Sequence, residues 1–180
     1  MEHLLQNKWT FWFILFNHQN QKNSQYQIEE ISSVDTVESF LQLFHSLPKI
    51  DDIKNVNNKR VSIGLFTQNE KGENIKPAWE DPANSNGGSF NFLINQNISN
   101  EAWHNLLLSI IGGTLQEPFG KNDKILGITI GPKKDDQYGI EIWNQNRNTT
   151  LVNKIKEYIC TIEGLSGVIK PTDISYKAHG

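Results

Sequence analysis

The sequence predicts an α+β fold in which an antiparallel sheet carries helices on one face. Short segments alternate apolar and polar residues with period two, which is typical of half-buried strands. Single segments with helical spacing of apolar residues lie between them. Two strand segments, 125–130 and 138–143, are close enough in sequence to form a hairpin, and a hairpin joins antiparallel strands. Such a sheet leaves its other face open to a ligand.

Helical spacing occurs three times, and the expected helices cover residues 35–47, 99–111 and 150–163. Asp35 and Glu38 form a capping-box pair at the start of the first helix, which stops before Pro48. The second helix starts near Ser99 or Asn100 and ends at a double glycine, a frequent helix terminator. The third places its apolar residues on one face from Leu151 to Ile162.

The expected strands lie before and between these helices, at residues 9–16, 62–66, 90–94, 125–130, 140–142 and 168–169. Asn and Gln cluster between the patterned segments. Clusters of this kind are typical of loops, and they occupy residues 17–27, 55–58, 68–74 and 144–148.

The chain as a whole has the size and charge of one small acidic domain. A length of 180 residues, with no Gly/Ser-rich or Pro-rich stretch, predicts a single domain over 1–180. The net charge of -3 argues against a protein that coats nucleic acid, because such a protein needs a broad basic surface. The single cysteine cannot form a disulfide within the chain, which favours a reducing compartment. We expect the cytoplasm, with the nucleus as a second location. The apolar run at 9–16 is too short to span a membrane.

The most unusual local feature is a tryptophan beside a carboxylate, Trp79-Glu80, between Pro77 and Pro82. The prolines disfavour a regular helix, so the indole is a flat surface in a polar loop. A purine made cationic by N7 methylation would stack on it with about 0.5 to 2 kcal/mol of cation–π energy. Glu80 can accept the two N–H donors of guanine, which adenine lacks. The plainer interpretation is a surface ring and a solvated charge.

Several motifs in order along nearly the whole chain resemble the eukaryotic translation initiation factor 4E family. They are residues 3–9 with Trp12-Phe13, residues 35–40, Pro77-Ala78-Trp79-Glu80-Asp81 with Gly87-Gly88, Trp103 with 106–112, and residues 140–144. The resemblance implies a curved antiparallel sheet with three helices on its convex face. It also implies that the concave face binds the 7-methylguanosine cap of messenger RNA in translation initiation.

The resemblance assigns roles to individual residues at the cap site. Trp79 would be one plate of the base sandwich, Glu80 the guanine-reading carboxylate, and Trp143 the ring beside the N7-methyl group. Lys133, with help from Lys134, would bind the cap phosphates. Judged from the residues alone, that lysine pair is a solvated hairpin loop.

Two positions depart from the family pattern. The loop before the first helix lacks the usual stacking tryptophan, so either Tyr26 replaces it or Ser24 stands at its position. Ser89 stands where the family often has a basic residue after the double glycine. These departures resemble the divergent third class of the family, and we expect weaker cap binding than in the main class.

The resemblance also implies a second binding surface, on the convex helices. There, partner proteins such as a 4G-like scaffold or 4E-binding proteins would dock an amphipathic helix with a Tyr-x-x-x-x-Leu-apolar pattern in an apolar groove. The positions that correspond are Val37, Leu41, Leu108, His3 and Leu4. Leu41 replaces a tryptophan often found there. For Val37, packing into the core is an equally good interpretation.

Two other functions compete with cap binding as interpretations of the sequence. An enzyme is disfavoured because the five histidines show no metal-ligand spacing and no nucleophile motif occurs, so we expect no cofactor and no metal. Cys160 lies beside Ile159 on the apolar side of the third helix, as a small core residue does. The other rival is an interaction module with weak or no cap binding that acts as a translational repressor.

Overall fold

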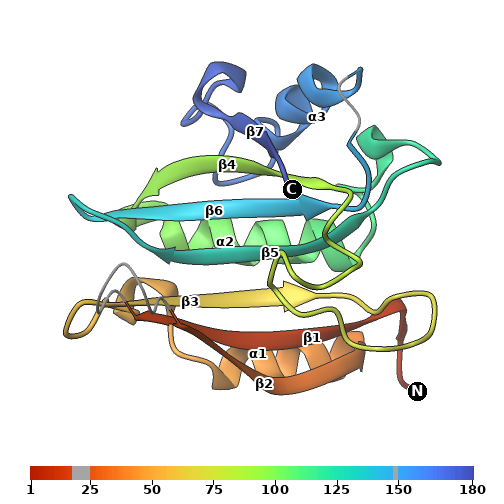
Figure 1. Ribbon diagram of the computed structural model, residues 1–180, viewed down its shortest axis with the longest axis horizontal. Helices are drawn as coiled ribbons and strands as arrows, with labels where there is room; N and C mark the ends of the chain where they lie inside the picture. Colours follow the sequence, from red (N-terminus) through yellow and green to blue (C-terminus); the bar gives the residue numbers. More distant parts are fainter. Residues whose placement is uncertain (18–24, 148–149) are drawn as a thin grey trace.

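The computed structural model describes residues 1–17, 25–147 and 150–180 (Figure 1). Its strands form one sheet in the order β2-β1-β3-β5-β6-β4-β7. The strands are β1 Leu4–Asn17, β2 Gln25–Thr36, β3 Lys59–Phe66, β4 Gly88–Asn95, β5 Ile125–Pro132, β6 Gln137–Asn144 and β7 Ser175–Ala178. The helices are α1 Val37–Ser46, α2 Gln96–Ile111 and α3 Val152–Ile159, with short 3-10 turns at Ile50–Asp52, Glu117–Phe119 and Pro171–Asp173.

Every strand pair in the sheet is antiparallel, as the sequence predicted. The predicted β5–β6 hairpin is confirmed, with Ile130 opposite Ile140. Figure 1 shows α1 and α2 behind the sheet and α3 at the β7 end. The α+β fold, a curved antiparallel sheet with three helices on its convex side, is therefore confirmed.

Two apolar cores lie on opposite faces of the sheet, because successive side chains of a strand point to opposite sides. The larger, here called the helix-side core, joins the sheet to the helices and includes Phe11, Phe40, Leu65, Leu106, Leu107, Ile128, Ile140, Ile142, Ile155 and Ile159. The smaller, here called the concave core, consists of Trp12, Phe66, Ile75, Leu126 and Trp143. The concave core thus supports the open face of the sheet.

The start of α1 differs from the prediction. Thr36, not Asp35, is the N-cap: its hydroxyl accepts a hydrogen bond from the Ser39 backbone N–H at 3.0 Å, and Ser39 Oγ accepts one from the Thr36 N–H at 3.1 Å. Glu38, the expected capping partner, instead accepts a hydrogen bond from the His3 backbone N–H at 3.0 Å. The capping box is real but lies one residue further along.

Other predicted boundaries were wrong in informative ways. β2 includes residues 25–27, which the Asn and Gln content assigned to a loop, because pairing with β1 overrides the weak strand propensity of these residues. Residues 168–169 are not a strand; the last strand is β7, which pairs with β4. α2 begins at Gln96, before the predicted start, and α3 ends at Ile159, before Gly164. Within residues 1–17, 25–147 and 150–180, no helix has the length and apolarity needed to cross a membrane.

Candidate functional site

A pocket of about 610 Å³ lies on the concave face and brings together most of the predicted cap-site residues. Strands β1, β2, β3, β5 and β6 and the loop before β4 all contribute to it. Its lining is Ile14, Phe16, Tyr26, Arg60, Ser62, Pro77, Ala78, Trp79, Glu80, Thr129, Lys133, Glu141 and Trp143. A pocket of this size, aromatic with a few polar groups, suits a small organic ligand.

Trp79 and Glu80 lie on a loop of consecutive turns that is braced from inside. The buried Asn84 amide donates hydrogen bonds to the Lys76 and Ala78 carbonyls, both at 2.8 Å. The Asp81 carboxylate accepts from the Lys76 and Ala83 backbone N–H groups at 2.9 and 3.0 Å. These bonds fix the backbone on both sides of Trp79, whose side chain stays 58% exposed. The indole is therefore presented to the pocket.

The double glycine after this loop is needed for close approach to neighbouring strands. A Cβ at Gly87 would overlap the carbonyl oxygen of Asn144, at the end of β6. A Cβ at Gly88 would overlap the Tyr176 hydroxyl on β7. The missing side chains let the loop return directly into β4, beside Trp143.

Trp143 is buried in the concave core and is held by two other rings. Its ring centroid lies 5.4 Å from that of Phe66, edge to face, and 4.6 Å from that of His179. His179 is itself buried, and its Nδ1 lies 3.1 Å from the Asn84 carbonyl oxygen. Burial lowers the pKa of His179, which favours the neutral ring at physiological pH. Through these contacts the segment after β7 is linked both to Trp143 and to the Trp79 loop.

Tyr26 forms another wall of the pocket. Its ring packs on Phe16 with centroids 4.5 Å apart, and its side chain is 58% exposed. Burial, and then the charges of Glu141 and Glu80, raise the pKa of the Tyr26 hydroxyl, so it stays protonated. Ser24, the alternative for the missing tryptophan, lies outside the described residues.

Lys133 and Lys177 both lie at the pocket. The side chain of Lys133 lies across Gly139, filling the space that a Cβ would take there. The Lys177 ammonium lies 5.7 Å from the Trp79 ring centroid, within cation–π range. Ser89, which replaced an expected basic residue, is paired in register with Lys177 of β7. Lys177 therefore supplies a positive charge next to the position where the sequence lost one. Lys134 is exposed in the same turn as Lys133 but does not line the pocket.

Four polar residues of the pocket were not expected from the sequence: Arg60, Ser62, Thr129 and Glu141. Thr129 and Glu141 are paired in register on β5 and β6. The alternation of β6 contained the signal for Glu141, because a residue two positions before Trp143 lies on the same face. Arg60 lies on β3 opposite Phe16, and no motif pointed to it.

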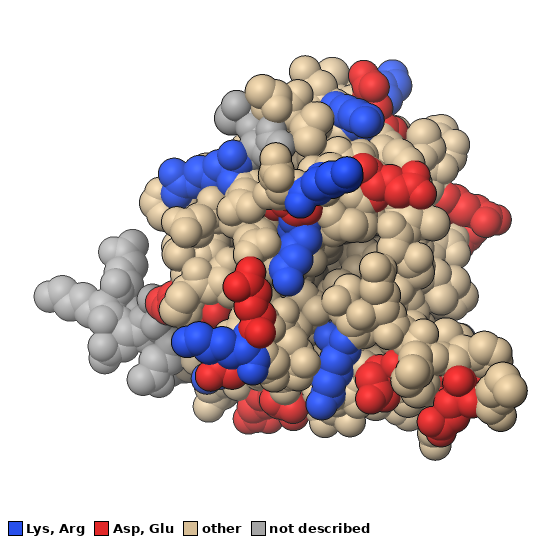
Figure 2. Space-filling view, turned by 90° about the vertical axis from the view of Figure 1, so that its right-hand side faces the viewer, with Lys and Arg blue, Asp and Glu red and all other residues tan. Residues whose placement is uncertain are grey.

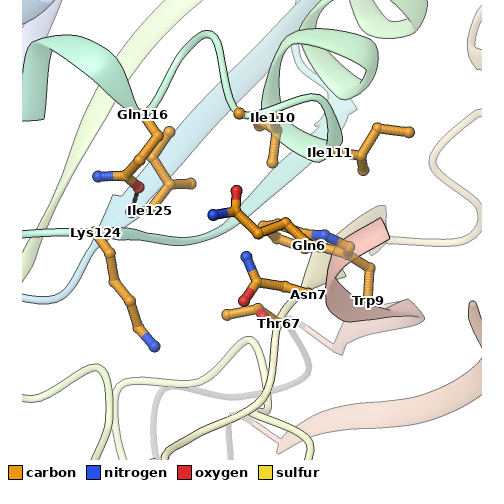
Figure 3. A pocket seen from close by; sticks show the side chains of 10 residues that line it. Gln6, Asn7, Trp9, Thr67, Ile110, Ile111, Gln116, Lys124 and Ile125 are labelled. Carbon is orange, nitrogen blue, oxygen red and sulfur yellow. Dashed lines mark hydrogen bonds between the residues drawn. The ribbon is translucent and has the colours of Figure 1, made fainter. Parts of the chain in front are cut away.

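Another cavity, of about 50 Å³, lies between the start of β1, the end of α2 and the start of β5 (Figure 3). It shares no lining residue with the concave pocket. Gln116 Oε1 accepts a hydrogen bond from the Ile125 backbone N–H at 2.9 Å, while the Lys124 ammonium points away from Gln6 and Trp9. The cavity has room for water-sized molecules but not for a nucleotide.

The predicted partner-binding residues lie on α1, on α2 and in the N-terminal segment up to the start of β1. The Val37 backbone N–H donates to the His3 carbonyl at 2.8 Å, and Leu4 is paired with Thr36, so the N-terminal segment lies beside α1. Val37 and Leu108 are 37% and 40% exposed, whereas Leu41 is partly buried against the helix-side core.

α1 and α2 meet one turn further along. There the Phe44 and His104 rings lie 5.1 Å apart and border an apolar pocket of about 300 Å³. Leu41 lies one turn before Phe44 and Leu108 one turn after His104, so the partly buried Leu41 and the exposed Leu108 flank the pocket.

The surface charge fits a local rather than an extended anion site. Figure 2 shows basic and acidic side chains interspersed on the face at the right of Figure 1, in keeping with the net charge of -3. The described cations at the pocket are thus local features.

Comparison with known proteins agrees with this geometry. The sequence profile described as "Eukaryotic initiation factor 4E" matches residues 4–180. Eukaryotic translation initiation factor 4E-2 of Schizosaccharomyces pombe is 31% identical over 98% of this chain and 67% of its own length. Eukaryotic translation initiation factor 4E of Candida albicans is 25% identical over 98% of this chain and 81% of its own length. The match to Drosophila melanogaster 4E1 covers 82% of this chain and only 52% of that relative.

Solved structures share the fold. Ascaris suum eIF4E-3, in complex with m7G cap, is similar with a TM-score of 0.77 and 22% identity, over 100% of this chain and 93% of that one. Caenorhabditis elegans eIF4E-3, in complex with the 4E-binding protein Mextli and a cap analog, gives a TM-score of 0.76 and 22% identity, over 99% and 93%. On the strength of the profile match over residues 4–180, the chain belongs to the eukaryotic initiation factor 4E family.

Proposed function

We propose that this protein binds the 7-methylguanosine cap of messenger RNA in its concave pocket, as a factor in translation initiation. The observation that carries the proposal is the convergence of Trp79, Glu80, Tyr26 and Trp143 on one pocket. The base would stack on Trp79, and Tyr26 would cover it on another side. Glu80 would accept the N1 and N2 hydrogen bonds of guanine, and Trp143 would lie beside the N7-methyl group.

The triphosphate would extend toward the cations of the pocket. Lys133 is the first candidate, and Lys177 is a second, beside Trp79. Lys134 stands in the same turn as Lys133 and would contribute through its charge alone. Each such contact would be moderate and weakened by salt.

A partner protein would bind on the opposite side of the sheet, through Val37, Leu41, Leu108, His3 and Leu4. The nematode relative bound to Mextli supports a protein partner of the 4E-binding or 4G-like kind. The role is one of binding and not of catalysis, since the relatives are named as initiation factors. Its proposed place is the cytoplasm, with the nucleus as a second location.

Fluorescence titration with 7-methyl-GTP and with GTP tests the cap site. We expect saturable tryptophan quenching by 7-methyl-GTP and much weaker quenching by GTP. Removing one stacking ring costs about 1 to 3 kcal/mol, so Trp79→Ala should weaken binding at least about fivefold. Glu80→Ala should weaken binding of both nucleotides, because it removes the acceptor for the two N–H donors of guanine, while Glu157→Ala, an exposed acid on α3, should change neither affinity.

Absence of quenching by either nucleotide would favour the second candidate, an interaction module that represses translation without binding the cap. The observation behind that candidate is the pocket wall at Tyr26, a 58% exposed phenol, together with the lack before α1 of the tryptophan usual in the family. Assignment to the divergent class of the family stays a prediction.

A further inference from the structure

Glu141 is a carboxylate on the floor of the concave pocket to which the proposed function gives no role. It is half-buried and lines the pocket together with Trp143 and Lys133. Among the described residues, no hydrogen bond or ion pair is formed by its side chain. Its charge nevertheless acts inside the pocket, since it contributes to the raised pKa of Tyr26. A partly desolvated, unpaired carboxylate is costly unless a ligand donates hydrogen bonds to it.

The position of Glu141 along β6 shows which part of a nucleotide it would face. Gly139, Glu141 and Trp143 alternate with core residues and so lie on one face of the strand. The Lys133 side chain lies over Gly139, at one end of this row. Two residues of a strand span about 7 Å, so Glu141 stands midway between the place for the phosphates and the place for the base.

In a nucleotide the ribose joins the base to the phosphates. A ligand with its base at Trp79 and Trp143 and its phosphates at Lys133 therefore holds its ribose above Glu141. Thr129, paired in register with Glu141 on β5, places a second polar side chain on the same floor. The floor under the ribose is thus polar, while the pocket wall at Ile14 and Phe16 is apolar.

We infer that Glu141, assisted by Thr129, binds the free 2′ and 3′ hydroxyls of the cap ribose and so selects caps in which both are unmodified. Each hydroxyl donates a hydrogen bond, and a carboxylate has two oxygens to accept them. Acidic side chains bind ribose hydroxyls in this way in dinucleotide-binding folds. The inference rests on the proposed cap binding, because it takes the pose of the nucleotide from that function.

The Glu141 carboxylate could bind the methylated base instead of the ribose, and the experiment must distinguish these two contacts. Glu141 lies two residues before Trp143 on the same face of β6, so its charge could instead stabilise the cationic methylated base. A ribose contact makes affinity depend on the ribose hydroxyls, whereas a base contact makes it depend on methylation. Comparing 7-methyl-GTP, its 2′,3′-dideoxy analogue and GTP distinguishes the two.

The experiment is a fluorescence titration of the full chain and of Glu141→Ala, Glu141→Gln and Thr129→Val with these three nucleotides. For the unmodified protein we expect about tenfold weaker binding of the dideoxy analogue than of 7-methyl-GTP. In Glu141→Ala the ratio of the two dissociation constants, that of the dideoxy analogue over that of 7-methyl-GTP, should fall to near one. The preference for 7-methyl-GTP over GTP should be kept. Glu141→Gln, which keeps one acceptor oxygen, and Thr129→Val should give intermediate ratios. Circular dichroism of each variant checks that the fold is kept.

Two results would overturn the inference while leaving cap binding intact. One is equal affinity of the unmodified protein for 7-methyl-GTP and the dideoxy analogue. The other is a Glu141→Ala variant that keeps the ribose ratio but loses the preference for methylation, which would assign Glu141 to the base. If 7-methyl-GTP does not bind at all, the proposed function and this inference fail together.

Discussion

His179 and Trp143 show how a residue far along the chain supports a predicted site residue. The imidazole packs on the indole with centroids 4.6 Å apart, and its Nδ1 meets the Asn84 carbonyl. Burial lowers the His179 pKa; Lys177 and Arg147 lower it as well, while the hydrogen bond to Asn84 and the charge of Glu141 act in the opposite direction. A neutral ring is thus part of the folded structure.

This pairing predicts a pH-dependent stability. Unfolding returns His179 to a pKa of about 6.5, so the unfolded chain binds a proton more readily. Stability from this residue is complete above about pH 6.5 and is lost as the pH falls toward the lower pKa of the folded state. Thermal unfolding from pH 7.5 to 5 should show this loss. His179→Phe should reduce it, and His45→Phe, an exposed ring on α1, should not. An unchanged pH slope in His179→Phe would contradict the assignment.

The candidate-site residues that belong to a motif could be predicted from the sequence. Trp79 and Glu80 stood out by their prolines, and Trp143 by family resemblance, and the structure places all three at one pocket. The place of Glu141 in the pocket and the contact of Lys177 with Trp79 were not predicted, because both depend on strand register, which no local pattern specifies.

Among the elements, α1 illustrates both the strength and the limit of local patterns. The capping box and the proline after the helix located it within two residues, yet the N-cap is Thr36 and not Asp35. Glu38 binds His3 instead of the backbone N–H of Asp35, so it cannot complete a capping box with Asp35. That contact lowers the pKa of the Glu38 carboxyl to about 2, chiefly through the hydrogen bond from the His3 side chain.

Substitution separates the two candidate caps. Thr36→Ala removes the side-chain acceptor for the Ser39 N–H and should lower the free energy of unfolding by about 1 kcal/mol. Asp35→Ala, at an exposed position, should change it by less than about 0.5 kcal/mol. Urea unfolding measures both, and a larger effect at Asp35 would restore the cap that the sequence suggested.

The turn into β4 depends on the absence of a side chain at Gly87. Gly87→Ala forces a Cβ against the Asn144 carbonyl, a backbone atom that cannot move independently of β6. We expect a loss of about 1 to 3 kcal/mol in stability and weaker 7-methyl-GTP binding, because the Trp79 loop is displaced. Gly72→Ala is the matched control: Gly72 has positive φ but open space, so only backbone strain applies and cap binding should persist. Equal effects at both glycines would argue against the close-contact explanation.

Across the whole molecule, the two proposed surfaces lie on opposite sides of one sheet. The concave pocket rests on the concave core, and the groove between α1 and α2 rests on the helix-side core. The antiparallel sheet and its helices followed from hydrophobic periodicity. β2 and β7 did not, because β2 has a mixed polar composition and β7 is four residues long. That residues 1–180 form one domain stays a prediction, for which coincident unfolding by fluorescence and circular dichroism is the measurement.

Separate faces predict separable functions. Leu108→Asp places a charge in the proposed groove and should abolish binding of a peptide with the Tyr-x-x-x-x-Leu-apolar pattern. The same variant should keep its affinity for 7-methyl-GTP, while Trp79→Ala should behave in the opposite way. Calorimetric titration of both variants with both ligands tests this. A large loss of nucleotide affinity in Leu108→Asp, with the fold intact, would show that the two faces are coupled.

The contact between His179 and Trp143 also has a consequence for synthesis on the ribosome. The chain is made from its N-terminus, so Trp79, Glu80 and Trp143 leave the ribosome before β7 and His179. β7 carries Lys177, and His179 packs on Trp143. A nascent chain that has emerged only through β6 holds the aromatic residues of the pocket without that support. The pocket therefore matures only after β7 and His179 have emerged, and we expect a nascent chain that ends before them to bind a cap nucleotide more weakly than the folded protein.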